Sequence, residues 1–178
     1  MRLFCAIDLP AAIRSSLKTL IDRFRPLAKL SWSPAENLHV TTKFIGEWPE
    51  ERLGEIESSL AAVHRPGAIS IAVRGLGWFP NERNPRVFWA GIESGDELRR
   101  LAHDTEQALA VLGVPVEDRD FSPHLTLARR RTPVPVERLR NEVGEMHARE
   151  FGSFQAESFF LYLSRAGRYT KLQEYPLV

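Results

Sequence analysis

Two short stretches of the sequence carry a histidine followed two positions later by a threonine. The first pair, His39 and Thr41, lies in LHVTTKFIG, and the second pair, His124 and Thr126, lies in SPHLTLAR. Each stretch has the alternation of a β-strand, in which successive side chains point to opposite faces. Each strand would bury one face and present an imidazole beside a hydroxyl on the other. A chain that does this twice is expected to bring the two pairs together.

These residue types suit acid–base chemistry. An imidazole titrates near about pH 6.5, so one histidine can accept a proton while the other donates one. The threonine hydroxyls can donate hydrogen bonds to phosphate oxygens, and strict alternation places Lys43 on the face of His39, where it adds a positive charge. A phosphodiester fits this set, because its cleavage needs a base for the nucleophile, an acid for the leaving oxygen and donors for the other phosphate oxygens.

Other interpretations of the motif are weaker. A single His-x-Thr arises easily by chance, but two copies on equivalent strands do not. Two histidines could hold zinc, yet no convincing third ligand is visible: Asp118 and Asp120 precede the second motif and have no counterpart before the first. We therefore expect no metal. Three further histidines fall in or beside expected helices and are interpreted as surface residues: His64, His103 and His147.

The elements around the two motifs follow the same order twice: strand, helix, histidine strand, helix, strand. Apolar periodicity and Gly or Pro breaks predict helices over 11–24, 49–63, 94–113 and 135–147, and strands over 2–9, 30–33, 38–46, 68–74, 87–92, 121–129, 158–163 and 168–175. Residues 75–81 are expected to form a loop in which Trp78 and Phe79 are anchors rather than a base-stacking platform. The whole chain, 1–178, is predicted to be one bilobal α+β domain with an internal repeat, roughly 1–80 and 85–178, and a cleft between the lobes.

Composition narrows the functional class. Lysine and arginine number 24 against 23 for aspartate and glutamate, a net charge of +1. This balance argues against wrapping of long nucleic acid, although it allows a local basic pocket. A lone cysteine, Cys5, favours a reducing compartment. The N-terminal apolar run is too short for a signal peptide, and no run reaches the roughly 18 residues of a membrane span. We expect a cytoplasmic monomer that is not bound to membranes.

The segments HVTT and HLTL, each a His-x-Thr-x motif, resemble those of the 2H phosphoesterase superfamily. RLFCAIDLP, NLHVTTKFIGEW, PRVFWAGI and FSPHLTLAR together resemble its RNA 2′,3′-cyclic phosphodiesterase branch, also called the 2′-5′ RNA ligase family. This resemblance covers essentially the whole chain. It implies a pseudo-two-fold fold with antiparallel sheets lining a central cleft and helices packed outside. It also implies hydrolysis, without a cofactor, of an RNA 2′,3′-cyclic phosphate end to a 2′-phosphate.

The resemblance also implies roles for individual residues. His39 would protonate the leaving 3′ oxygen, and His124 would take the proton from water. Thr41 and Thr126 match phosphate-binding threonines. Arg129 matches a basic residue that often follows the second motif, although strict alternation turns it away from His124.

Two alternatives remain at this point. The same site could join a cyclic phosphate to an RNA 5′-hydroxyl without ATP, as a 2′-5′ RNA ligase, because an RNA hydroxyl can replace water. The chain could also bind RNA ends without catalysis, although intact histidines and threonines in both motifs argue against this.

Overall fold

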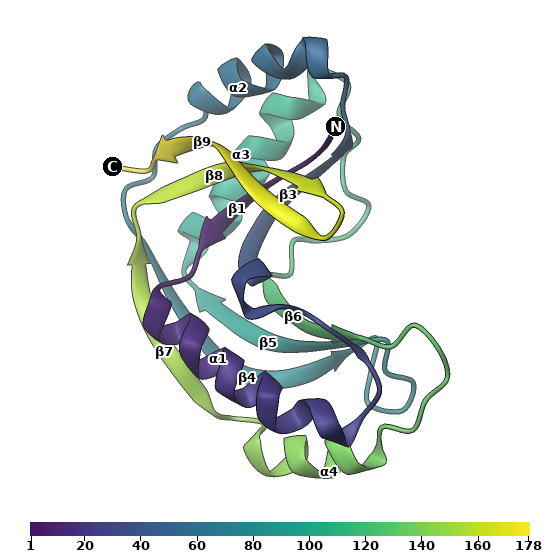
Figure 1. Cartoon of the computed structure of the whole chain (residues 1–178). Coiled ribbons are helices and arrows are strands. Elements are labelled where there is room, and N and C mark those ends of the chain that lie inside the picture. The colour runs from purple at the N-terminus through teal and green to yellow at the C-terminus, as the bar shows by residue number, and fades with distance from the viewer.

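The computed structural model describes all 178 residues, which form two antiparallel sheets and four α-helices (Figure 1). The strands are β1 (Arg2–Asp8), β2 (Ser31–Trp32), β3 (His39–Glu47), β4 (Ile69–Phe79), β5 (Val87–Ser94), β6 (His124–Arg129), β7 (Glu150–Ala156), β8 (Ser158–Arg165) and β9 (Arg168–Pro176). The helices are α1 (Ala11–Phe24), α2 (Leu53–Ala61), α3 (Asp96–Ala110) and α4 (Glu137–Met146). None of them is long and apolar enough to cross a membrane.

Each sheet carries one of the two histidine strands. The first sheet has the order β3-β1-β8-β9 and the second has the order β2-β6-β5-β4-β7. Helices α2 and α3 pack with the first sheet, and α1 and α4 pack with the second (Figure 1). The predicted α+β fold with antiparallel sheets is therefore confirmed, and the histidine strands β3 and β6 occupy matching places beside β1 and β5.

The two sheets do not divide the chain near residue 80, where the sequence suggested a boundary between repeats. Strand β4 belongs to the first half of the chain but pairs in the second sheet. Strands β8 and β9 come from the end of the chain and return to the first sheet. Each lobe thus draws on both halves of the sequence.

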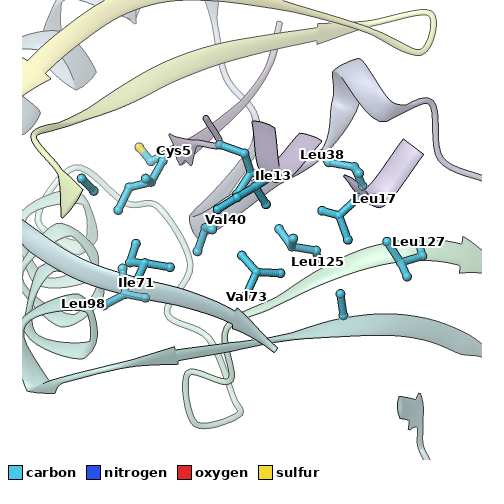
Figure 2. Packing of buried hydrophobic residues seen from close by; sticks show 14 of the residues in the cluster. Cys5, Ile13, Leu17, Leu38, Val40, Ile71, Val73, Leu98, Leu125 and Leu127 are labelled. Carbon is cyan, nitrogen blue, oxygen red and sulfur yellow. The ribbon is translucent and has the colours of Figure 1, made fainter. Parts of the chain in front are cut away.

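One core joins the two lobes. A single cluster of 40 buried residues takes side chains from both sheets and from the helices. Figure 2 shows part of it, where Val40 and Leu125, which follow the two catalytic-candidate histidines, lie in the same interior as Ile13, Ile71 and Leu98. The apolar residues of the histidine strands thus pack into the core, and this packing fixes the position of the strands that carry the motifs.

Two predicted details were wrong. Residues 75–79 continue β4 instead of forming a loop, because a bulge between Val73 and Leu76 lets the strand resume its pairing with β5. Gly75 in this bulge has φ +82°, a left-handed conformation that glycine adopts without strain. The second error is β7, which was not expected because only Phe151 and Ala156 are buried in it.

The closing hairpin is as expected from the sequence. Strands β8 and β9 pair antiparallel around Ala166 and Gly167. Both turn residues have positive φ, +50° and +75°, as a type I′ hairpin turn requires. This hairpin brings Tyr162, Tyr169 and Lys171 to the first histidine strand's sheet.

Candidate active site

The two histidines are held in the same way. Nδ1 of His39 lies 3.0 Å from the carbonyl oxygen of Asn37, and Nδ1 of His124 lies 2.8 Å from that of Ser122. A carbonyl only accepts, so each Nδ1 carries a hydrogen and donates it. Nε2 is then the nitrogen that gains or loses a proton in each ring. Strands β3 and β6 come from different sheets but contact one another.

A β-bulge in β3 changes which side chains accompany His39. The pairing with β1 skips Thr42, so that Thr42 and Lys43 both turn toward the core, at 5% and 3% exposure. Phe44, 58% exposed, then returns to the face of His39 and Thr41. The prediction that Lys43 shares the face of His39 is therefore wrong.

Lys43 instead forms a buried ionic contact behind the strand. Its Nζ lies 3.0 Å from Oε1 of Glu106 in α3 and donates to the carbonyl oxygen of Pro115 at 2.7 Å. The same Glu106 oxygen accepts the backbone N–H of Glu117 at 2.7 Å. Lys43 and Glu106 thus tie β3 to the segment that leads into the second motif.

An equivalent bulge in β6 has the opposite consequence for Arg129. The pairing with β5 skips Leu127, and both Leu127 and Ala128 are fully buried. Arg129 returns to the face of His124 and Thr126 and is exposed. Strict alternation had turned it away, so that expectation was wrong. The positive charge of Arg129 contributes to lowering the pKa of His124.

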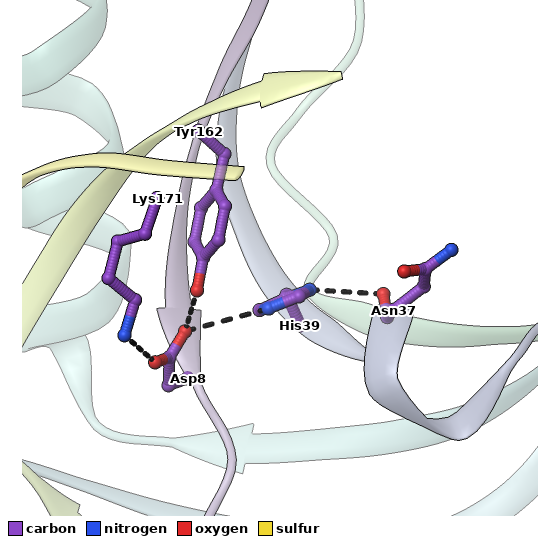
Figure 3. A network of polar contacts seen from close by, with 5 residues as sticks. All are labelled: Asp8, Asn37, His39, Tyr162 and Lys171. Atoms are coloured by element: carbon purple, nitrogen blue, oxygen red, sulfur yellow. Dashed lines mark hydrogen bonds and ion pairs between the residues drawn. The ribbon is translucent and has the colours of Figure 1, made fainter. Parts of the chain in front are cut away.

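A carboxylate network surrounds His39 (Figure 3). Oδ1 of Asp8 lies 3.6 Å from Nε2 of His39 and accepts a hydrogen bond from the Tyr162 hydroxyl. Nζ of Lys171 donates to Oδ2 of Asp8 at 2.6 Å. Burial acts to raise the pKa of Asp8, but the hydrogen bonds from Lys171 and Tyr162 outweigh it and the pKa is lowered. Asp8 is therefore an anion at neutral pH.

The two imidazoles have different charged neighbours. Burial lowers the pKa of His39 below its ordinary value, the Asn37 carbonyl and Asp8 oppose this shift, and the positive charges of Arg14 and Lys171 add to it. Burial also lowers the pKa of His124, but its charged neighbour, Arg129, lowers it further. Asp8 is the only anion that favours the protonated form of either ring, and it acts on His39, whereas the only charged group that acts on His124, Arg129, favours its neutral form.

Packed aromatic rings support His124. The Phe79 ring meets the imidazole edge-on at a centroid distance of 4.9 Å, and Trp89 lies 5.3 Å from Phe79. The Trp89 indole covers Gly77 so closely that a Cβ there would collide with the ring. Phe79 is thus a neighbour of the site, in a segment that the sequence placed in a loop.

Sequence reasoning missed Asp8, Tyr162 and Lys171. Asp8 carries no motif of its own, and its partners Tyr162 and Lys171 lie far away in the sequence, in β8 and β9. The structure contains no group of three or more His, Cys, Asp or Glu side chains that could hold a metal ion.

Two sheets that each present a histidine–threonine pair are the arrangement expected of a two-histidine phosphoesterase. A family model described as LigT-like phosphoesterase matches residues 7–89 and 91–169. The chain belongs to this family.

Relatives and solved structures agree with this assignment. The RNA 2′,3′-cyclic phosphodiesterase of Archaeoglobus fulgidus is 38% identical over 85% of this chain and 88% of its own. That of Methanocaldococcus jannaschii is 32% identical over 92% and 91%. A crystal structure of a Thermus thermophilus protein superposes with a TM-score of 0.81 at 32% identity, covering 99% of this chain and 98% of that one. E. coli LigT complexed with 3′-AMP gives 0.77 at 27% identity, covering 98% and 97%.

Proposed function

We propose that this protein hydrolyses the 2′,3′-cyclic phosphate end of RNA to a 2′-phosphate, with His39 as acid and His124 as base. The observation that carries the proposal is the pair of identically held histidines with neighbours of opposite charge, Asp8 and Arg129. The names of the relatives, which are RNA 2′,3′-cyclic phosphodiesterases, support the substrate class.

The proposed reaction is an in-line displacement at phosphorus. Neutral His124 accepts a proton from water on Nε2 as the water oxygen bonds to phosphorus. The bond from phosphorus to O3′ breaks, and protonated His39 gives its Nε2 proton to O3′. The products are a 2′-phosphate and a free 3′-hydroxyl. The protein is left with protonated His124 and neutral His39, and exchange with solvent restores the starting state.

We propose that three side chains meet the charge on the phosphoryl oxygens. The Thr41 and Thr126 hydroxyls lie on the faces of the two histidines, and Arg129 follows on the face of His124. Such fixed donors stabilise charge that develops in the transition state. We propose that they do so without a divalent ion. Lys43 has no part in this proposal, because its ammonium group binds Glu106 and the Pro115 carbonyl oxygen on the core side of β3.

Replacement of the histidines tests the proposal. His39→Ala and His124→Ala should each lower kcat by roughly 10²–10⁴, the usual worth of one proton transfer. Thr41→Val and Thr126→Val each remove one neutral hydrogen bond and should lower kcat less. Steady-state kinetics on an oligonucleotide with a cyclic-phosphate end measures all four variants.

His103→Ala is the matched control, because His103 lies exposed on α3 and should retain wild-type kinetics. The double variant of His39 and His124 should lose less than the product of the single losses, since residues that act as a unit are not additive. Near-normal kcat in His124→Ala would refute the two-histidine mechanism.

A further inference from the structure

The exposed aromatic side chains of this protein gather at one place. Phe44 is 58% exposed and Tyr169 is 39% exposed, and every other Phe, Tyr or Trp of the chain is more buried than these two. Their strands, β3 and β9, are the two edges of the first sheet. Both rings belong to one aromatic group that also contains His39. Exposed aromatic surface of this kind marks a binding site more often than a single scattered side chain does.

The two strands between β3 and β9, which are β1 and β8, carry a second, separate apolar cluster. It consists of Phe4, Ala6, Phe160 and Tyr162, and it is distinct from the main core. Phe4 is paired with Phe44 on one side and with Tyr162 on the other, in register across three strands. The Phe4 and Tyr162 rings stack at 5.2 Å with an interplanar angle of 9°. Contacts with Phe4 in this cluster orient the rings of Phe44 and Tyr169.

His39 lies within the same aromatic group. Its imidazole centroid is 4.6 Å from that of Tyr162 and 5.8 Å from that of Tyr169. Phe4 is 4.9 Å from Tyr169 and 6.4 Å from Phe44. An aromatic surface therefore begins directly beside the proposed acid.

The geometry of the proposed reaction predicts which part of the substrate would lie on the aromatic surface beside His39. In an in-line displacement the attacking water and the leaving O3′ are on opposite sides of phosphorus. O3′ belongs to the terminal ribose, so the nucleoside lies on the side of the acid, His39, and the water lies on the side of His124. The base of that nucleoside would then contact the first sheet, which carries His39.

We infer that Phe44 and Tyr169 form the stacking surface for the base of the nucleotide that carries the cyclic phosphate. The inference rests on the proposed function for the placing of the nucleoside. Every base has a π-face, so such a surface accepts all four bases. The larger ring systems of adenine and guanine should bind more tightly than those of cytosine and uracil.

The aromatic pair on the other lobe is a poorer candidate for this base. Phe79 and Trp89 are only half-exposed, and their faces are used in contacts with one another, with His124 and with the backbone at Gly77. They also lie on the side from which water attacks.

The test compares two ligands that differ only in the base. Calorimetric titration with 2′-AMP and with methyl β-ribofuranoside 2-phosphate, in which a methoxy group stands in place of the base, measures binding without any need for turnover. Wild-type protein should bind 2′-AMP about tenfold more tightly, because stacking on one aromatic side chain is worth about 1–3 kcal/mol and 1.4 kcal/mol is tenfold. Phe44→Ala and Tyr169→Ala should each reduce this ratio, and together they should bring it close to one.

Two controls separate stacking from structural damage. Tyr169→Phe keeps the ring and should keep the ratio. Val111→Ala removes an apolar side chain that is 86% exposed on another part of the surface and should change neither affinity.

Each remaining outcome is decisive. Equal binding of both ligands by wild-type protein, or an unchanged ratio in the double variant, would overturn the inference. Equal weakening of both ligands would also overturn it, because the rings would then act on the phosphate site or the fold. A ratio that is lost as expected, in a protein that leaves cyclic phosphate uncut, would keep the base site and refute the proposed function.

Discussion

At the scale of single residues, the two histidines are held alike and differ in their charged neighbours. Each Nδ1 faces a backbone carbonyl two positions earlier, which leaves Nε2 for chemistry. Asp8 lies beside His39, and Arg129 acts on His124. The motifs themselves were visible in the sequence. Asp8 was not, because what makes it important is its contact with β3, β8 and β9, which the sequence does not reveal.

The pKa directions predict the pH dependence of kcat/KM. The proposed mechanism requires protonated His39 and neutral His124, so the rate should fall below the pKa of His124 and above the pKa of His39. Burial lowers both pKa values below the ordinary value of about 6.5. The profile should therefore be a bell with its optimum on the acidic side of pH 6.5. An optimum well above pH 7 in the free enzyme would contradict this.

Asp8→Asn tests which limb belongs to which histidine. The Asp8 carboxylate favours protonated His39, so its removal should lower the pKa of His39 further. The alkaline limb of kcat/KM should then move to lower pH while the acidic limb stays in place. Asp22→Asn, on exposed α1, should move neither limb. Movement of the acidic limb alone in Asp8→Asn would show that the lower of the two pKa values belongs to His39, which would contradict this assignment of the limbs.

At the scale of elements, the two bulges decide which charges reach the site. Periodicity correctly indicated the helix over 11–24, the histidine strands and the closing hairpin. It failed after Thr42 and Leu127, where one extra residue reverses the facing of the residues that come next. Lys43 was predicted at the site and is behind it, whereas Arg129 was predicted away from it and is beside it. A bulge depends on pairing with another strand, which a single strand's pattern does not reveal.

The new position of Lys43 predicts an effect on stability. Glu106→Ala leaves the buried Lys43 ammonium with the Pro115 carbonyl and with the exposed Glu117 carboxylate at 3.7 Å, so the loss of the charged hydrogen bond should lower the free energy of unfolding by about 2 kcal/mol. Lys43→Met removes the buried charge itself and should cost no more than about 1 kcal/mol. Urea unfolding of both variants measures the difference.

The Lys43→Met variant also tests whether Lys43 belongs to the substrate site. Lys43→Met should retain wild-type kcat/KM, because the side chain lies on the core side of β3. A large loss of kcat/KM in a variant that unfolds like the wild type would return Lys43 to the substrate site.

At the scale of the whole molecule, the sheets exchange elements and share one core. The α+β class and the family could be predicted, since both rest on motifs and on the order of elements. The distribution of strands between the sheets could not, because β4, β8 and β9 pair with strands far away in the sequence. The consequence is that Asp8, which lies beside His39, accepts hydrogen bonds from Tyr162 and Lys171 of the C-terminal hairpin. The first half of the chain alone would lack both partners of Asp8.

The central claim is that two histidines open the cyclic phosphate at O3′ without a divalent ion. End-group analysis tests it most directly: the protein is incubated with an RNA oligonucleotide bearing a 2′,3′-cyclic phosphate, in the presence of EDTA, and the new end is identified. We predict complete conversion to a 2′-phosphate with a free 3′-hydroxyl. A 3′-phosphate product would reverse the assigned acid and base, and unchanged substrate that is cleaved only when a divalent ion is restored would contradict the mechanism.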